Sequence, residues 1–176
     1  MAFISENGVE GASVLEIGGG VGGIQVELLA RGAARTTNLE LVDSYEADAR
    51  ALATEAGVAD RIQRRQLDIA VAPDQVGAHD VVVLHRVVCC YPDYDGLLNA
   101  AADHATRVLV FSYPPRTVLN RAGFGLENMW RRLRHNDFRT YLHDPDALLG
   151  AAQRHGLHPS FEHRNRDWNV VGLTTT

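Results

Sequence analysis

Lysine is absent from this sequence of 176 residues, in which all 17 basic residues are arginines. A lysine amine forms the Schiff base of many covalent enzymes, binds phosphate in the P-loop and assists tyrosine in a large class of reductases. The sequence therefore excludes these three chemistries.

Cysteine is almost as scarce, and the two cysteines, Cys89 and Cys90, are neighbours. Adjacent residues cannot build a disulfide framework, and neither cysteine stands at metal-ligand spacing from a histidine. We expect reduced thiols that fill apolar space at the end of a strand, and no metal site.

Long apolar runs and an excess of positive charge are also missing. No run approaches the roughly 20 residues of a membrane span, and the N-terminus lacks the basic and apolar regions of a secretory signal. The formal net charge of -5 gives no overall attraction to nucleic acid or anionic lipid. We expect a cytoplasmic protein with neither a nucleic-acid nor a membrane partner.

Short β-branched runs alternate with longer helical stretches, a pattern typical of βαβ units around a parallel sheet. At 45% hydrophobic residues the chain describes one domain, 1–176. The predicted strands are Ser13–Ile17, Thr36–Leu41, Arg61–Gln66, Asp80–His85 and Arg107–Ser112. The predicted crossover helices are Gly23–Gly32, Ser44–Gly57 and Tyr94–Ala105. The fold class is α/β, doubly wound and Rossmann-like.

The pattern changes after Pro114 and Pro115. It predicts helices over Val118–Leu133 and Pro145–His155, followed by strands over Leu157–Arg164 and Trp168–Thr176. A short polar turn joins these two strands, so we expect an antiparallel hairpin at the C-terminus.

The stretch "VLEIGGGVGG" places glycines between a strand and a helix, where a ligand can approach the backbone and the free N–H groups of the helix. Two patterns compete there. The dinucleotide pattern G-x-G-x-x-G uses Gly18, Gly20 and Gly23, whereas the pattern acidic-x-G-x-G-x-G uses Glu16, Gly18, Gly20 and Gly22.

Three acidic residues at the ends of successive strands favour the second pattern. Glu16 can hold the ammonium of an amino acid, directly or through water. Glu40, or alternatively Asp43, can bind a ribose hydroxyl pair, and we favour Glu40. Asp68 can accept from the exocyclic amine of adenine. An amino acid, a ribose and an adenine together describe S-adenosylmethionine.

The sequence resembles the class I S-adenosylmethionine-dependent methyltransferases over essentially its whole length. The resemblance rests on "VLEIGGGVGG", "NLELVDSYEADA", "QLDIA" and "HDVVVLHRVVCCYPDYDGLL". It implies a mostly parallel sheet of seven strands whose last strand is antiparallel, with S-adenosylmethionine as the cofactor.

Within that family, "CCYPDYDGLLNAAADHATRVLVFSYPPRTVL" and "FRTYLHDPDALLGAAQRHGL" resemble the magnesium-protoporphyrin O-methyltransferase branch. The branch places a histidine directly before its Tyr-Pro pair, where this chain has Cys90 before Tyr91. It also carries a longer N-terminal helical segment that covers the cofactor, and we expect that segment to be short or missing here.

Methyl transfer needs alignment more than catalytic groups, and a base only where the acceptor keeps its proton. The candidate catalytic residues are His85 and Tyr91, with the Cys90 thiol as a further option. His85 is also a candidate cofactor contact. A basic run, which forms a solvated helix face or attracts an anionic acceptor, contains Arg131, Arg132, Arg134 and Arg139.

Three functions remain open. The first is methyl transfer to a small-molecule acceptor, for which a carboxylate-bearing compound is one candidate. The second is an inactive cofactor-binding or scaffold protein, and the third is a nicotinamide-dependent oxidoreductase. The apolar stretch Val118–Trp130 could form a lid or a dimer surface, so a homodimer is a further expectation.

Overall fold

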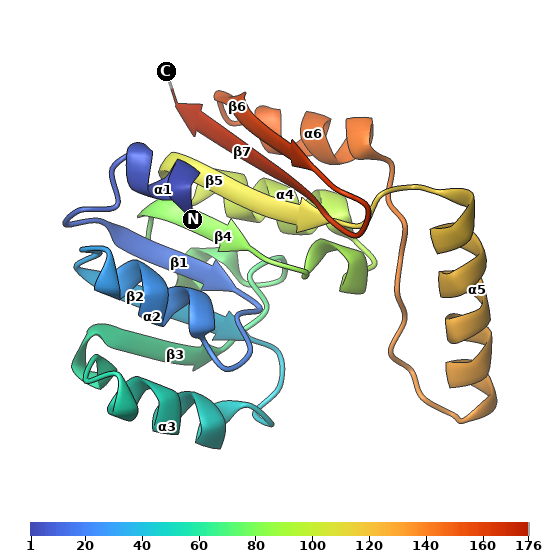
Figure 1. Cartoon of the computed structure of the whole chain (residues 1–176), viewed down its shortest axis with the longest axis horizontal. Helices are drawn as coiled ribbons and strands as arrows, with labels where there is room; N and C mark the ends of the chain where they lie inside the picture. Colours follow the sequence, from blue (N-terminus) through green and yellow to red (C-terminus); the bar gives the residue numbers. More distant parts are fainter. Residues whose placement is uncertain (176) are drawn as a thin grey trace.

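The computed structural model describes residues 1–175, in which seven strands form one sheet (Figure 1). Their spatial order is β3-β2-β1-β4-β5-β7-β6. The strands are β1 (Ser13–Ile17), β2 (Arg35–Glu40), β3 (Ile62–Gln66), β4 (His79–Leu84), β5 (Ala105–Tyr113), β6 (Leu157–Arg164) and β7 (Asn169–Thr175). Strands β2 and β3 are added to one side of β1 and β4 and β5 to the other, so the strand order reverses between β1 and β4, and β1 pairs in parallel with both β2 and β4. Such a reversal is where open α/β sheets bind ligands.

Helices cover both faces of this sheet (Figure 1). The α-helices are α1 (Ala2–Glu6), α2 (Gly23–Ala30), α3 (Glu46–Glu55), α4 (Tyr94–Asp103), α5 (Val118–Leu133) and α6 (Pro145–Gln153). Three 3-10 turns, η1 (Ala59–Arg61), η2 (Pro73–Gln75) and η3 (Val88–Cys90), complete the connections.

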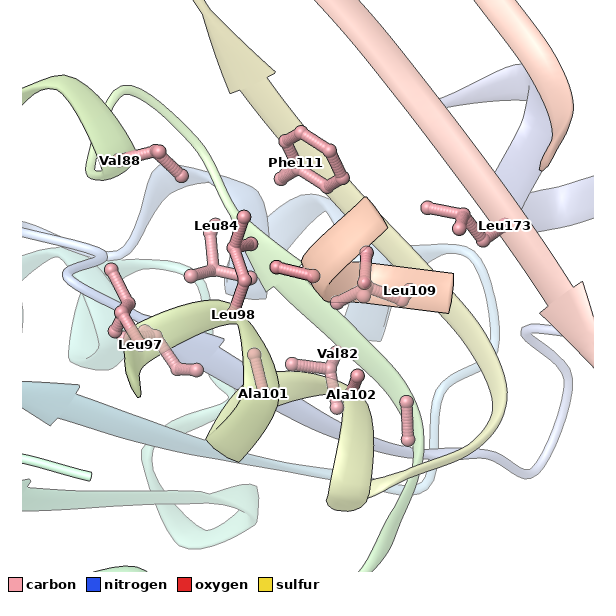
Figure 2. Packing of buried hydrophobic residues seen from close by; sticks show 14 of the residues in the cluster. Val82, Leu84, Val88, Leu97, Leu98, Ala101, Ala102, Leu109, Phe111 and Leu173 are labelled. Carbon is pink, nitrogen blue, oxygen red and sulfur yellow. The ribbon is translucent and has the colours of Figure 1, made fainter. Parts of the chain in front are cut away.

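Side-chain alternation along the central strands divides the core between these two faces. Leu15 of β1 and Val82 of β4 belong to one buried cluster, whereas Val14 and Val81 belong to the other. All five residues of β1 are buried, as expected for a parallel strand with helices on both sides. Figure 2 shows the first cluster, in which Leu98 of α4 packs against β4 and β5.

The C-terminal strands form the predicted hairpin. β7 pairs antiparallel with both β5 and β6. The doubly wound, mostly parallel sheet with an antiparallel C-terminal strand is therefore confirmed. The predicted second strand of the hairpin starts one residue early, at Trp168, and its last residue, Thr176, lies outside the described residues.

The predicted elements are correct in type, and their ends differ from those of the structure by at most two residues; the predictions for β1, α5 and β6 match at both ends. The prediction of strand up to His85 is wrong because β4 ends at Leu84, and Arg61 belongs to η1 instead of β3. Helix α1 is missing from the prediction. Its Phe3 is buried and stacks on Phe161 of β6, with ring centroids 5.0 Å apart. A helix of five residues is fixed by such tertiary contacts, and its short sequence carries no periodic signal.

Helix α5 stands away from the sheet and returns to α6 through an extended strap, residues 134–144 (Figure 1). None of its residues is buried. Large apolar side chains on this helix are exposed, among them Leu119, Leu126 and Trp130. Across residues 1–175, no helix combines the length and the apolar character needed to cross a membrane.

Candidate functional site

A cavity of about 450 Å³ opens at the carboxyl ends of β1, β2, β3 and β4. Its size is that of a small-molecule site, and its lining is mostly apolar. The polar and charged side chains that line it are those of Glu40, Tyr45, Asp68, Arg86, Cys90 and Tyr91. The apolar walls come largely from Leu39, Leu41, Val42, Leu67, Ile69, Leu97 and Phe138.

The glycine turn between β1 and α2 borders this cavity through Gly18 and Gly20. Gly18, Gly20 and Gly22 have left-handed backbone conformations, with φ of 65°, 55° and 85°. Side chains rarely tolerate this region, so the turn needs glycine at these three positions. Gly23 begins α2 without a positive φ, and a Cβ on it would meet no atom within 4 Å, so close helix–strand packing, the role of the third glycine in the dinucleotide pattern, does not require glycine there. The backbone therefore favours the acidic-x-G-x-G-x-G pattern over the dinucleotide pattern.

Glu40, the last residue of β2, connects this turn to the cavity wall. Its Oε2 accepts a hydrogen bond of 2.8 Å from the Gly20 N–H, and its Oε1 accepts one of 3.2 Å from the Leu41 N–H. Asp43 lines a smaller neighbouring depression, which Glu40 also borders, and does not line the main cavity. The geometry thus supports Glu40 over Asp43 for the predicted ribose contact.

Asp68 follows β3 and lines the same cavity. Its Oδ1 accepts from the Ala70 N–H at 3.0 Å, and its Oδ2 accepts from the Tyr91 hydroxyl at 2.8 Å. Desolvation and the hydrogen bond to Asp68 raise the pKa of Tyr91 to about 12. The tyrosine hydroxyl stays protonated near neutrality, which suits a donor that positions Asp68 better than a general base.

Glu16 lies beneath the glycine turn instead of in the cavity lining. It is 2% exposed, and a Cβ on Gly19 would lie 2.5 Å from its Cδ atom. Burial raises the pKa of this carboxyl to about 7, while the neighbouring Gln25 and the charge of Arg64 act against the shift. Within residues 1–175, its Oε2 has no hydrogen-bond partner. Of the two predicted routes to an ammonium group, direct contact or contact through water, this position favours water.

His85 is placed beside the cavity, outside its lining. Its Nδ1 lies 3.2 Å from Oγ of Ser112, which accepts a hydrogen bond from the Arg86 N–H. Desolvation by neighbouring groups and the charge of Arg86 lower the pKa of His85, so the ring is neutral near pH 7. A role toward an acceptor fits this position better than the predicted contact with the cofactor.

Three residues that sequence reasoning missed shape the site. Arg64 of β3 donates to the Gly20 carbonyl at 2.9 Å and to Glu46 at 2.9 Å. Asn38 of β2 is fully buried beneath the turn, and neither polar atom of its side chain has a partner among the described residues. Arg86 lines the cavity with a left-handed backbone, φ 62°, which is uncommon outside glycine and typical of functional sites. Of these three residues, only Arg86 could have been suspected from the sequence, because it is a cation directly after a predicted buried strand.

The predicted basic run is largely engaged with its own surroundings. Arg131 pairs with Glu127 and lies over the Phe138 ring, with its guanidinium carbon 4.4 Å from the ring centroid. Arg134 lies over Trp130 at 3.7 Å, and Arg139 donates to the carbonyl oxygen of Phe138. These contacts leave Arg86 as the cation that lines the cavity.

Comparisons with known proteins agree with this geometry. A family model described as "Methyltransferase domain" matches residues 1–159. The chain therefore belongs to the methyltransferase domain family. No curated protein matches the sequence.

Several solved structures share the fold. Magnesium protoporphyrin IX methyltransferase from Synechocystis PCC 6803 with bound S-adenosylhomocysteine is 18% identical, with a TM-score of 0.77 over 99% of this chain and 79% of that one. A sarcosine dimethylglycine methyltransferase candidate from Galdieria sulphuraria is 13% identical, with a TM-score of 0.77 over 99% and 83%. An O-methyltransferase family protein from Burkholderia thailandensis is 18% identical, with a TM-score of 0.80 over 99% and 55%. The resemblance to class I methyltransferases is thus confirmed at the level of family and fold.

Proposed function

We propose that the chain binds S-adenosylmethionine in the main cavity and transfers its methyl group to a small-molecule acceptor that carries an anionic group. The observation that carries the proposal is the convergence of the left-handed glycine turn, Glu40 and Asp68 on one cavity. The family match and the solved neighbours that hold S-adenosylmethionine or S-adenosylhomocysteine support it. The family match also leaves the nicotinamide alternative without support.

The residues present fit this cofactor. A Cβ on Gly20 would meet no atom within 4 Å, so space remains open above the turn for a ligand that approaches the backbone. Glu40 supplies carboxylate oxygens for a ribose hydroxyl pair, and Asp68 supplies one for an exocyclic amine. Exposed apolar side chains near Glu40, those of Leu41 and Val42, offer a surface for a base.

When bound, S-adenosylmethionine supplies a methyl carbon activated by its sulfonium. The protein's contribution is alignment and exclusion of water, because an in-line displacement needs few catalytic groups. His85 is neutral near pH 7 and sits beside the cavity, so it can take a proton from an acceptor that retains one. Tyr91 holds Asp68 in place.

The anionic character of the acceptor is argued from Arg86. Its guanidinium stacks over Trp168 at 4.9 Å, and it forms no ion pair with an acidic side chain of the described residues. An unpaired guanidinium at a cavity is suited to a carboxylate, which it can bind with two hydrogen bonds. A lysine at this position would keep the positive charge but could not replace Arg86, because two parallel hydrogen bonds to a carboxylate require the planar guanidinium group.

The first experiment is calorimetric titration with S-adenosylhomocysteine, with NAD as the parallel control. We expect micromolar binding of S-adenosylhomocysteine alone. Absence of binding by the folded chain would overturn the cofactor assignment.

The acceptor is tested by transfer of labelled methyl from S-adenosylmethionine to a set of matched acids and their amides. Magnesium protoporphyrin IX belongs in the set because a structural neighbour is named for it. We expect turnover of an acid and loss of that turnover in Arg86→Gln. A matching loss of S-adenosylhomocysteine affinity in this variant would instead assign Arg86 to the carboxylate of the cofactor, because Arg86 lines the same cavity. Cofactor binding without turnover of any acceptor would instead support the inactive cofactor-binding or scaffold alternative.

A further inference from the structure

The 3-10 turn η3 presents two thiols at the cofactor cavity. The Sγ atoms of Cys89 and Cys90 lie 3.6 Å apart, and each thiol lies 3.8 Å from the Arg86 carbonyl oxygen. Cys89 is buried, whereas Cys90 is half-buried and lines the cavity. One thiol is therefore accessible to a small molecule, and the second is held directly behind it.

We propose that Cys90 is a site of reversible oxidation by a peroxide, that Cys89 is its resolving thiol, and that the oxidised pair weakens cofactor binding. Peroxide-sensitive cysteines are accessible and stand next to a resolving thiol, and η3 meets both conditions. The oxidation is independent of the function proposed above. Only its effect on cofactor binding rests on that function.

The surroundings of the pair favour an attacking thiolate at Cys90. Arg131 lies near this thiol, and its Nη1 is buried without a partner among residues 1–175. The hydrogen bond from Cys89, together with the charge of Arg131, lowers the pKa of Cys90 to about 7. The same hydrogen bond and burial raise the pKa of Cys89, which therefore remains a neutral donor. Cys90 is thus the nucleophile that reacts first, and Cys89 is the resolving thiol.

The reaction balances with hydrogen peroxide as the oxidant. The Cys90 thiolate attacks one peroxide oxygen, the O–O bond breaks, and hydroxide leaves and takes up a proton as water. The resulting sulfenic acid is attacked by the sulfur of Cys89, so that an S–S bond forms and the S–OH bond breaks. The Cys89 proton leaves with that hydroxyl as a second water. Two electrons pass from the two sulfurs to the peroxide.

A bond between these residues must distort η3. Adjacent Cα atoms are about 3.8 Å apart, which is shorter than the roughly 4.4 to 6.8 Å spanned by ordinary disulfides. A strained disulfide is readily reduced, so the modification is reversible by thiols.

The distortion reaches the cavity through three hydrogen bonds. The Cys89 carbonyl oxygen accepts from the Tyr141 N–H at 2.7 Å, and the Tyr91 carbonyl oxygen lies 3.0 Å from Nε2 of His143. These two contacts fix the strap, residues 134–144, whose Phe138 lines the cavity. Tyr91 itself donates to Asp68. Movement of η3 therefore displaces both a cavity wall and the adenine-site acid.

The modification is tested first by mass spectrometry of the folded, full chain after hydrogen peroxide treatment and alkylation of the remaining thiols. We expect the peptide with both cysteines to lose two hydrogens and to regain them with dithiothreitol. Cys89→Ser should instead accumulate a sulfenic acid that dimedone traps, and Cys90→Ala should resist oxidation at Cys89. Equal oxidation of the two thiols in the single variants, or none under conditions that oxidise glutathione, would overturn the assignment.

The effect on the site is measured by titrating reduced and oxidised protein with S-adenosylhomocysteine. We expect affinity to fall at least about tenfold on oxidation and to recover with dithiothreitol. Unchanged affinity in protein shown to be oxidised would overturn the coupling to the cofactor site. Failure of the reduced protein to bind S-adenosylhomocysteine would contradict the proposed function, while the mass-spectrometric result would still decide whether the pair oxidises.

Discussion

The Tyr91 hydroxyl donates a hydrogen bond of 2.8 Å to Oδ2 of Asp68, across the cavity edge between η3 and the segment after β3. The Ala70 N–H binds the other carboxylate oxygen, so the orientation of the carboxylate is set from both sides. Asp68 can still accept from a ligand, because each carboxylate oxygen has more than one acceptor site.

Tyr91→Phe should weaken S-adenosylhomocysteine binding by about 1 kcal/mol, since it removes one of the two hydrogen bonds that orient Asp68. Calorimetry measures this loss. Tyr45→Phe is the matched control, because Tyr45 lines the same cavity and its hydroxyl has no hydrogen bond within the described residues. Equal losses in the two variants would show that the tyrosine rings, and not the bond to Asp68, determine affinity.

Glu40→Ala should weaken cofactor binding by roughly 1–3 kcal/mol. The substitution removes a carboxylate from the cavity wall and also the acceptor of the Gly20 N–H. Asp43→Ala should have little effect, because Asp43 does not line this cavity. The two variants are compared by titration with S-adenosylhomocysteine. The reverse ranking would mean that Asp43 is the ribose ligand.

Gly20→Ala should abolish most cofactor binding. Its loss of folding stability should be close to that of Gly57→Ala, a substitution far from the cavity. Gly20 and Gly57 both have positive φ, 55° and 66°, and a Cβ on either would meet no atom within 4 Å. Both alanine variants should therefore lose a similar free energy of unfolding, about 1 kcal/mol, from backbone strain. Only the Cβ at position 20 projects beside the cavity.

Urea unfolding measures the stability of the two alanine variants, and titration with S-adenosylhomocysteine measures their affinity for the cofactor. Matched stabilities with affinity lost in Gly20→Ala alone would support close approach of the ligand to the turn. Normal affinity in Gly20→Ala would place the ligand elsewhere in the cavity.

The sequence predicted the sheet, its hairpin and the pair of cavity acids, Glu40 and Asp68, because these follow from patterns that are local along the chain. Strands that end in the same direction place their terminal acids at one edge of a sheet. The position of the glycine turn follows in the same way from the strand and helix that flank it.

Residues whose role depends on side-chain direction were harder to predict. Glu16 and Asn38 belong to paired strands and meet beneath Gly19, which no linear spacing reveals. Arg64 sits in a polar strand at the sheet edge and reaches Gly20 from 44 positions away in the chain. His85 follows the end of β4, and its Nδ1 lies 3.2 Å from Oγ of Ser112 in β5. Tertiary packing determines each of these directions.

Glu16 should make the folded state less stable as pH rises. Burial raises its folded-state pKa to about 7 from an ordinary value of 4.5. Between these two pH values the folded chain keeps a proton that the unfolded chain has released, so the free energy of unfolding falls with increasing pH. The shift corresponds to a loss of about 3 kcal/mol, which is complete once the pH exceeds the folded-state pKa.

Glu16→Gln removes the ionisation and retains the shape of the side chain. Urea unfolding at about pH 5 and about pH 8 should therefore show a smaller decline in this variant than in the parent chain. Glu55→Gln, at an exposed position that ends α3, is the control and should leave the decline unchanged. Because histidines with lowered pKa values, such as His85, change stability in the opposite direction, the difference between the two chains is the result that decides. An equal change with pH in the parent chain and in Glu16→Gln would show that Glu16 is not held protonated beneath the glycine turn, and that its carboxylate is compensated by groups such as Gln25 and Arg64.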